Sequence, residues 1–218
     1  MTTHGLGILV TYGKFMGGFY LSLAILWVIL IAAGYIFFSP RVLRLMREIR
    51  EPFLLAFSTS SSEAAYPKTV EQLERFGVSN RIVSFVLPLG YSFNLDGTMM
   101  YTTFATIFIA QAYGIELPLI TQIGMLFLLM VTSKGMAGIP RASLVVIAAT
   151  LSTFNIPEAG LLLILGIDHF LDMGRSATNV IGNSIATCVV AKWEGEYDPK
   201  RIHEPLEDPE PVHPPIAA

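Results

Sequence analysis

The chain has few charged residues and a single cysteine. Charged side chains make up 14% of the 218 residues, against about 25% in average soluble domains, and the mean hydropathy is +0.58. Both values disfavour an ordinary soluble enzyme. Cys188 has no second cysteine with which to form an internal disulfide, so it is most simply a small packing residue. The net charge of −3 and the lack of a basic stripe with interleaved aromatics argue against a nucleic-acid partner.

Catalytic signatures are also lacking. The sequence contains no G-x-S-x-G nucleophile elbow, and its four histidines show no metal-ligand spacing. On paper Ser62 or Ser133 could pair with His169, yet His169 lies roughly 100° around a helix from Asp168. We therefore predict that the chain is not an enzyme and carries no cofactor.

Long apolar runs dominate what is present. Met16–Phe38 is 23 residues without a charge, and a bilayer-spanning helix needs about 20 such residues. The alternative is a buried helix of a large soluble core, but such helices rarely run so far without a polar face. An arginine cluster follows the run directly, and the positive-inside bias places that end in the cytoplasm and the preceding end outside. The cluster comprises Arg41, Arg44, Arg47 and Arg50.

Short and long apolar segments alternate along the rest of the chain. Short hairpins are predicted around the serine run STSSSEAAYP and around the tip TSKGMAGIPRAS, because apolar arms of about 10 to 14 residues are typical of re-entrant or interfacial segments. Residues 82–112 and 157–190 are long enough to span. Paired, interrupted hydrophobic segments of this kind indicate a secondary transporter with internal repeats. The proline-rich tail after Lys192 is predicted to be disordered and cytoplasmic.

The last long segment carries polar side chains on one helix face. At roughly 100° per residue they fall within an arc of about 100°, and ionisable residues at membrane depth by default mark a substrate or ion pathway. Arg175 suits a carboxylate because its planar fork bonds in a bidentate way, whereas Asp172 suits an ammonium group. The alternative is a structural Asp172–Arg175 pair sealed between helices. The face comprises Asp168, a candidate structural acceptor, with Asp172, Arg175, Ser176, Asn179 and Asn183.

The stretch SFNLDGTMMY interrupts the preceding apolar segment. Asn94 and Asp96 offer oxygen ligands, and Thr98 adds a hydroxyl. Unwinding around Gly97 is expected to free backbone carbonyls, as in transporter sites for monovalent cations, and such backbone is tolerated at membrane depth only where it is buried or lines a cavity. The alternative for Asn94 is a mere helix-breaking loop residue.

Each of the two hairpin tips has two possible interpretations. The glycines and the proline of TSKGMAGIPRAS suit a mobile lid, but they also suit a tight structural turn. The serine run could offer hydroxyls and free backbone N–H groups to a site, and it could equally be a plain linker.

Four motifs in order resemble the dicarboxylate/amino acid:cation symporters, the glutamate transporter family: SSSEAAYP, PLGYSFNLDGT, TSKGMAGIP and DHFLDMGRSATNVIGN. The resemblance covers about residues 7–198 and is strongest to the bacterial proton- or sodium-coupled glutamate/aspartate type. It implies an all-α membrane protein of the bacterial inner (plasma) membrane, in contact with lipid, with a transport domain of three transmembrane helices and two re-entrant helical hairpins. The implied segments are an extracellular start at 1–6, transmembrane helices at 7–38, 80–114 and 157–191, re-entrant hairpins at 41–78 and 117–155, and a disordered cytoplasmic tail at 199–218.

The resemblance also implies roles for single residues. Arg175 resembles the residue that binds the side-chain carboxylate of the substrate, and Asp172 the one that binds its amino group. Further implied substrate contacts are Thr98, Ser176, Asn179 and, at the hairpin tips, Ser60, Ser62, Gly138 and Ile139. Implied coupling-cation ligands are Gly90, Asn94, Asn179 and Asn183 in one site, Ser92, Ser133, Lys134 and Met136 in a second, largely through their backbone carbonyls, and Asn94 with Asp96 in part of a third.

Several positions depart from the family pattern. Asn183 stands where sodium-coupled aspartate members have an aspartate, and Lys134 lies within the second cation site; both favour proton coupling. Asp172 favours acidic amino acids over four-carbon dicarboxylates. Thr102 replaces a glutamate of the animal members, so potassium counter-transport is not implied, and Arg141 replaces a usual small residue of the gate.

Length is the largest departure. The helices that resemble the trimerisation scaffold are not in the sequence, so a homotrimer of this chain is not implied, and Met1 is a candidate internal start. We predict the C-terminal part of a symporter that takes up glutamate or aspartate with sodium or protons. The alternatives are a four-carbon dicarboxylate symporter and a non-transporting membrane fragment.

Overall fold

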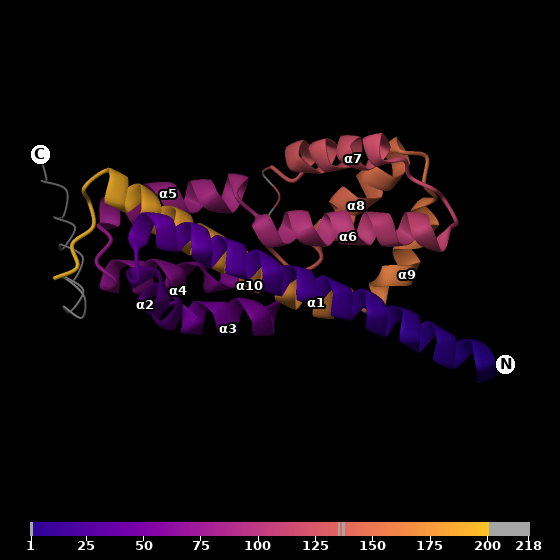
Figure 1. Ribbon diagram of the computed structural model, residues 1–218, viewed down its shortest axis with the longest axis horizontal. Coiled ribbons are helices and arrows are strands. Elements are labelled where there is room, and N and C mark those ends of the chain that lie inside the picture. Colours follow the sequence, from indigo (N-terminus) through magenta and orange to yellow (C-terminus); the bar gives the residue numbers. More distant parts are fainter. Residues whose placement is uncertain (1, 135, 137, 201–218) are drawn as a thin grey trace, which may run out of the picture.

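A computed structural model describes residues 2–134, 136 and 138–200, with side chains from Gly7 onward (Figure 1). Every regular element within these residues is helical, apart from one isolated bridge between Val78 and Tyr197. The prediction of an all-α chain is confirmed for them. Most of the predicted tail, from residue 201, lies outside the described residues.

The first helix, α1 (Thr2–Phe38), matches the long apolar run. Its portion Gly7–Phe38 is long and apolar enough to cross a membrane, and only 17% of its most apolar window is buried. The helix ends where Ser39 takes a left-handed conformation and Pro40 follows, because a proline cannot continue the hydrogen-bond ladder. The arginine cluster then forms the short helix α2 (Arg41–Glu48) and begins the next helix.

Helices α3 (Arg50–Thr59) and α4 (Ser62–Arg75) form the first hairpin. The serine run makes the turn itself: Ser60 is left-handed with φ 53°, and Ser61 caps α4 by accepting a hydrogen bond from the Ala64 N–H at 3.2 Å. The predicted hairpin at 41–78 therefore contains a separate helix, α2, which joins α3 through a bend at Ile49.

Helices α5 (Asn80–Phe93) and α6 (Asp96–Ala112) are the two halves of the predicted broken segment. The break falls at Asn94 and Leu95, whose ψ angles of 65° and 71° are not helical. Gly97 was expected at the centre of the unwound stretch, but it lies in the first turn of α6. A glycine is required at this position by a close contact with a neighbouring segment, and not by an unusual backbone conformation.

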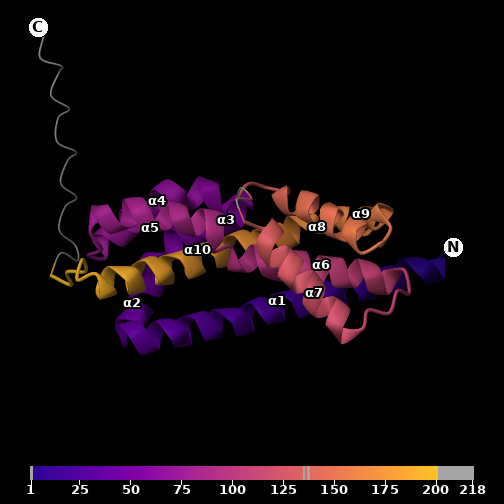
Figure 2. The same ribbon diagram turned by 90° about the horizontal axis from the view of Figure 1, so that it is seen from above.

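The second hairpin consists of α7 (Leu119–Thr132) and α8 (Ala142–Thr153), two apolar helices too short to count as spans. Figure 2 shows the two hairpins on opposite halves of the molecule, with their tips meeting near its middle. Residues 135 and 137 of the second tip lie outside the described residues.

The predicted continuous helix at 157–191 is divided into three pieces. They are a 3-10 turn (Glu158–Gly160), α9 (Leu161–Leu165) and α10 (Asp168–Trp193). The interruption falls at Gly166 and Ile167, where the Ile167 N–H bonds to the Ile164 carbonyl in a tighter turn. Asp168 thereby opens α10 instead of lying inside a longer helix.

Helix α10 is the centre of the fold and is buried along most of its length, whereas the neighbouring α1 is largely exposed (Figure 1). Two large clusters of buried apolar side chains surround it, and a third, small one joins Val180 to Ala56 and Ala65. One of the large clusters contains Leu45, Leu73 and Leu87 around the C-terminal half of α10, and the other contains Phe19 and Leu151 around its beginning. The polar residues of α10 lie between the two clusters, where the hairpin tips also meet.

Candidate functional site

Arg175 is the point at which four parts of the chain converge. Its side chain is 0% exposed. From α10, its Nη1 donates to Thr98 Oγ1 on α6 at 3.3 Å, and its Nη2 donates to the carbonyls of Ser60 at 3.5 Å and Ile139 at 3.1 Å. Its Nε lies 2.5 Å from Asp172 Oδ1, an ion-pair contact whose geometry is not that of a hydrogen bond. A buried guanidinium is tolerated only with such partners.

The two hairpin tips also contact each other directly. Ser61 Oγ donates to the Gly138 carbonyl at 3.0 Å, and the Gly138 N–H donates to Glu63 Oε1 at 3.3 Å. A Cβ at Gly138 would collide with Ser62 Oγ. The four tip residues implied by the family resemblance are therefore brought to one place, around the guanidinium of Arg175.

Asp172 and Asp168 tie α10 to the second hairpin. Asp172 Oδ2 accepts a hydrogen bond from the Arg141 N–H at 2.7 Å, and Asp168 Oδ2 lies 3.7 Å from Arg141 Nε. Asp168 Oδ1 accepts from the Tyr101 hydroxyl at 2.5 Å, as expected of a structural acceptor. Sequence reasoning missed Tyr101, although a tyrosine one turn after Gly97 within an apolar helix was a signal of a buried partner. The Asp172–Arg175 pair exists, but it belongs to this larger network.

Asn179, which belongs to α10, forms hydrogen bonds with the first turn of α6. Its Oδ1 accepts hydrogen bonds from the N–H groups of Gly97 at 2.9 Å and Thr98 at 3.3 Å, and its Nδ2 donates to Thr98 Oγ1 at 3.1 Å. Because the residue at the N-cap of α6 is Leu95, the helix has no capping side chain of its own. Gly97 lets the two helices approach, since a Cβ there would collide with the Arg175 carbonyl oxygen.

Oxygen atoms gather where α5 breaks. Asn94 Nδ2 donates to Asn183 Oδ1 at 3.4 Å, and the amide orientations here follow from that contact. A Cβ at Gly90 would meet Asn183 Oδ1, and a Cβ at Gly182 would meet Asp96 Oδ2. Asp96 Oδ2 is buried without a hydrogen-bond partner among the described residues.

A buried, unpartnered carboxylate oxygen next to an unwound break in a helix can act as a ligand of a hard monovalent cation. These residues therefore fit a coupling cation. Ser176, another predicted contact, is fully buried, and its hydroxyl has no partner within the described part of the chain. The described residues contain no group of three or more His, Cys, Asp or Glu side chains that could hold a metal ion.

The second predicted cation set is arranged differently. Ser133 Oγ donates to Met99 Sδ at 3.1 Å, and the Met136 N–H donates to the Ser133 carbonyl at 3.3 Å. The Lys134 ammonium donates to the Phe93 carbonyl in the last turn of α5, which also contains Ser92. An ammonium has no lone pair, so Lys134 could serve as a cation ligand only through its backbone carbonyl, as the prediction had it for most of this set.

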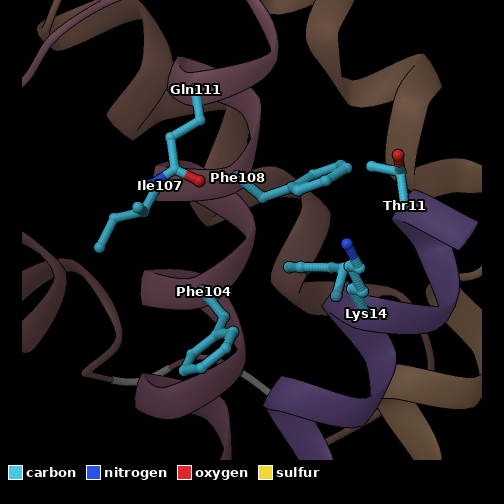
Figure 3. A pocket seen from close by; sticks show the side chains of 7 residues that line it. Thr11, Lys14, Phe104, Ile107, Phe108 and Gln111 are labelled. Carbon is cyan, nitrogen blue, oxygen red and sulfur yellow. The ribbon is translucent and has the colours of Figure 1, made fainter.

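A surface pocket of about 380 Å³ lies away from these residues, between α1 and α6. Figure 3 shows Thr11 and Lys14 of α1 facing Phe104 and Phe108 of α6. None of the predicted site residues lines it. The pocket therefore does not belong to the site around Arg175.

Similar proteins point the same way as the geometry. The Sodium:dicarboxylate symporter family model matches residues 1–193. The chain is 46% identical over 207 residues to a C4-dicarboxylate transport protein 2 of Polaromonas naphthalenivorans (94% of this chain, 46% of that protein). It is 51% identical over 164 residues to a proton/sodium-glutamate symport protein of Geobacillus stearothermophilus (75% and 39%), and 43% identical over 197 residues to one of Bacillus subtilis (90% and 46%).

The chain spans less than half the length of these relatives. The family match agrees with the four motifs and with the prediction that the chain is not an enzyme, and it implies a membrane location. The chain belongs to the sodium:dicarboxylate symporter family, a family of transporters.

Proposed function

We propose that this chain forms the substrate-binding part of a symporter for acidic amino acids, glutamate or aspartate, coupled to sodium or protons. The observation that carries the proposal is the fully buried Arg175, which both hairpin tips contact through backbone carbonyls. A substrate carboxylate bonds to a guanidinium more strongly than a neutral carbonyl does, because the bond is charge-assisted and bidentate. The substrate carboxylate takes the place of the carbonyls of Ser60 and Ile139.

This replacement requires the tips to separate. In the arrangement described, Arg175 Nη2 is engaged by the Ser60 and Ile139 carbonyls, and the Gly138 carbonyl is engaged by Ser61. The α7–α8 hairpin therefore has to move away from α10 before a substrate enters, and it closes again over the bound substrate. Lid movements of this kind are common gates in binding proteins and enzymes.

Asp172 gives the site its preference for an amino acid. Its Oδ2 is held by the Arg141 N–H, which belongs to the moving tip. When the tip withdraws, this oxygen is free to accept a hydrogen bond from the substrate ammonium. The coupling cation binds at Asp96, Asn94 and Asn183, where the carboxylate oxygen without a partner is available.

A four-carbon dicarboxylate is the second candidate substrate, since a relative at 46% identity is named a C4-dicarboxylate transport protein. Arg141 favours this candidate, because its guanidinium lies near Asp168 and offsets negative charge that repels a second carboxylate. Competition by succinate against bound aspartate separates the two candidates.

The placement in the membrane is also a proposal. Residues 7–198 form part of a transport domain in a bacterial plasma membrane, with re-entrant hairpins at α3–α4 and α7–α8. The C-terminal end of α10 lies at the cytoplasmic face, because Lys192 Nζ donates at 2.5 Å to the carbonyl of Phe37, next to the arginine cluster of α2. The exposed apolar surface of α1 contacts lipid or the remainder of the protein.

Calorimetry with the purified chain in detergent tests the proposal. Aspartate is titrated with sodium and choline at two pH values, and succinate is used as competitor. The Arg175→Ala variant is expected to lose about 30-fold or more in affinity, since truncating one partner of a buried charge pair costs roughly 2–5 kcal/mol. Equal binding by wild type and variant, or no binding by a chain that unfolds cooperatively, contradicts the proposal. The latter result favours a non-transporting fragment.

A further inference from the structure

Two adjoining pockets form one groove on the exposed surface of α1 and α6. The first, of about 380 Å³, lies between the two helices, and the second, of about 530 Å³, lies where α6 leads into α7. Ile107 and Gln111 of α6 line both pockets. Pockets of about 300–1,000 Å³ are large enough to hold a small organic ligand. The groove is therefore large enough for a lipid headgroup and the first part of an acyl chain.

The groove is apolar at one end and polar at the other. Phe15 of α1 stacks on Phe108 of α6, with the ring centroids 4.2 Å apart. Figure 3 shows Phe104 at one end of the first pocket and Thr11 and Gln111 at the other. A surface of this polarity suits an amphiphile, whose apolar chain contacts the rings and whose polar group lies at the opposite end.

The groove also contains one charged side chain of each sign. Lys14 lines the first pocket, and Glu116 lines the second. Lys14 is the only charged residue in the apolar portion Gly7–Phe38, and Glu116 is the only one between Asp96 and Lys134. Both side chains are exposed, and neither has an ion-pair or hydrogen-bond partner within the part of the chain that the structure describes. Both charges are therefore available to an external ligand.

The position of Lys14 matches the depth of lipid headgroups in the proposed membrane placement. It comes two residues before the charge-free run Met16–Phe38, which is long enough to cross the hydrocarbon core. A lysine at such a depth extends its methylene groups along apolar surface and its ammonium toward the headgroups. Figure 1 shows that α1 begins and α6 ends at the same end of the molecule. Glu116, which follows α6 by four residues, therefore lies toward the same membrane surface.

We propose that this groove binds one phospholipid with a primary ammonium in its headgroup, as in phosphatidylethanolamine. The Lys14 ammonium donates to the lipid phosphate, and the lipid ammonium donates to the Glu116 carboxylate. One acyl chain lies along Phe15 and Phe104. The phosphate and the ammonium of this headgroup are joined by a short ethylene link, so their opposite charges match two neighbouring side chains of opposite charge, and both hydrogen bonds are charge-assisted.

Phosphatidylglycerol fits the same groove less well. Its headgroup supplies the phosphate but no cation, so Glu116 stays unpaired and its charge repels the lipid. Phosphatidylcholine has a cation, but its quaternary ammonium has no N–H group to donate. The inference rests on the proposed membrane placement and goes beyond the proposed transport of acidic amino acids.

Native mass spectrometry of the purified chain in detergent tests the proposal. Phosphatidylethanolamine, phosphatidylglycerol and phosphatidylcholine with identical acyl chains are titrated one at a time, without aspartate. The variants are Lys14→Gln and Glu116→Gln. The matched controls are Lys192→Gln and Glu158→Gln, because these two side chains are also exposed and line neither pocket. Thermal unfolding of the same samples checks that each variant is folded.

Wild type is expected to bind phosphatidylethanolamine several-fold more tightly than the other two lipids. Lys14→Gln should weaken its binding about tenfold or more, the effect of losing a hydrogen bond to a charged group. Glu116→Gln should remove the preference for phosphatidylethanolamine over phosphatidylglycerol, and both control variants should bind as wild type does.

Equal binding of the three lipids by wild type overturns the proposal and marks the groove as unselective apolar surface or as a contact for another part of a longer protein. Unchanged lipid preference in Glu116→Gln, or losses of equal size in Lys14→Gln and Lys192→Gln, also overturns it. Because aspartate is omitted, these results are independent of whether the chain binds an amino acid. A failure of the lipid proposal therefore leaves the proposed function standing, and a failure of aspartate binding leaves the lipid result interpretable.

Discussion

Asn179 on α10 caps a helix to which it does not belong, by accepting a hydrogen bond from the Gly97 N–H of α6 at 2.9 Å. The two residues are 82 positions apart in the sequence. The same amide group donates to Thr98 Oγ1, which in turn accepts from Arg175. One side chain therefore both begins α6 and orients a hydroxyl at the candidate substrate site.

Replacing Asn179 with alanine should lower stability. The change removes the cap of α6 and leaves two buried N–H groups unpaired, so the expected loss is about 1–3 kcal/mol in the free energy of unfolding. Thermal or denaturant unfolding in detergent measures it. Asn80→Ala is the control, because the Asn80 side chain makes exposed contacts with Glu74 and Ser84, and it should change stability by less than about 0.5 kcal/mol. Equal losses in both variants would rule out the capping role.

Gly97→Ala should be destabilising even though alanine is the better helix former. The added methyl group would collide with the Arg175 carbonyl oxygen and would lie 2.8 Å from Thr178 Cβ, and overpacking of this kind costs about 1–3 kcal/mol. Gly124→Ala on α7 is the opposite case, since a Cβ there meets nothing within 4 Å. It should stabilise the chain by up to about 1 kcal/mol. Unfolding curves that shift in the same direction for both variants would contradict the close-contact explanation.

Tyr101→Phe should lower the stability of the protein, because it removes a hydrogen-bond donor from the buried Asp168 carboxylate. The hydroxyl donates to Asp168 Oδ1 at 2.5 Å, and neither side chain is exposed. Leaving that oxygen without a donor is expected to cost about 1–3 kcal/mol in unfolding free energy. The control is Tyr20→Phe, whose hydroxyl donates to the exposed Phe170 carbonyl, and water can replace that bond. A Tyr101 variant as stable as the Tyr20 variant would show that Asp168 has another source of compensation.

Two substitutions at Arg141 distinguish the effect of backbone strain on stability from the effect of ion pairing. Its φ of 65° is left-handed, which costs a non-glycine residue roughly 1–2 kcal/mol, whereas its pair with Asp168 is 66% exposed on the arginine side and is worth about 0–1 kcal/mol. Arg141→Gly should therefore be as stable as wild type or more stable by about 1 kcal/mol. Arg141→Ala keeps the strain and loses the pair, so it should be less stable than Arg141→Gly. Calorimetric unfolding of both variants decides the sign, and an alanine variant at least as stable as the glycine variant refutes the strain argument.

Much of the fold follows from local pattern. The uncharged run from Met16 to Phe38 predicts a long helix, and Asn94 with Asp96 marks the break, because both signals depend on residues close together in sequence. The polar face of α10 was also predictable from its spacing. The structure buries all six of its members, from Asp168 to Asn183.

Other features could not be read from local pattern. The interruption at Gly166 and Ile167 lies in an apolar stretch, where a glycine alone does not distinguish a kink from a continuous helix. Gly97 is required by the approach of α10 and not by its own backbone conformation. In neither case does the sequence of the segment itself contain the cause of the feature.

The sequence by itself determined most of the helical segments, the break before α6 and the family, since periodicity, composition and motif order are properties of neighbouring residues. Only the tertiary structure decided which groups meet. It placed the carbonyls of Ser60 and Ile139 on one guanidinium and the Lys134 ammonium on the end of α5. These contacts join segments far apart in the chain. The packing of whole helices, and not the local sequence, determines which groups lie close enough to bond with the buried arginine.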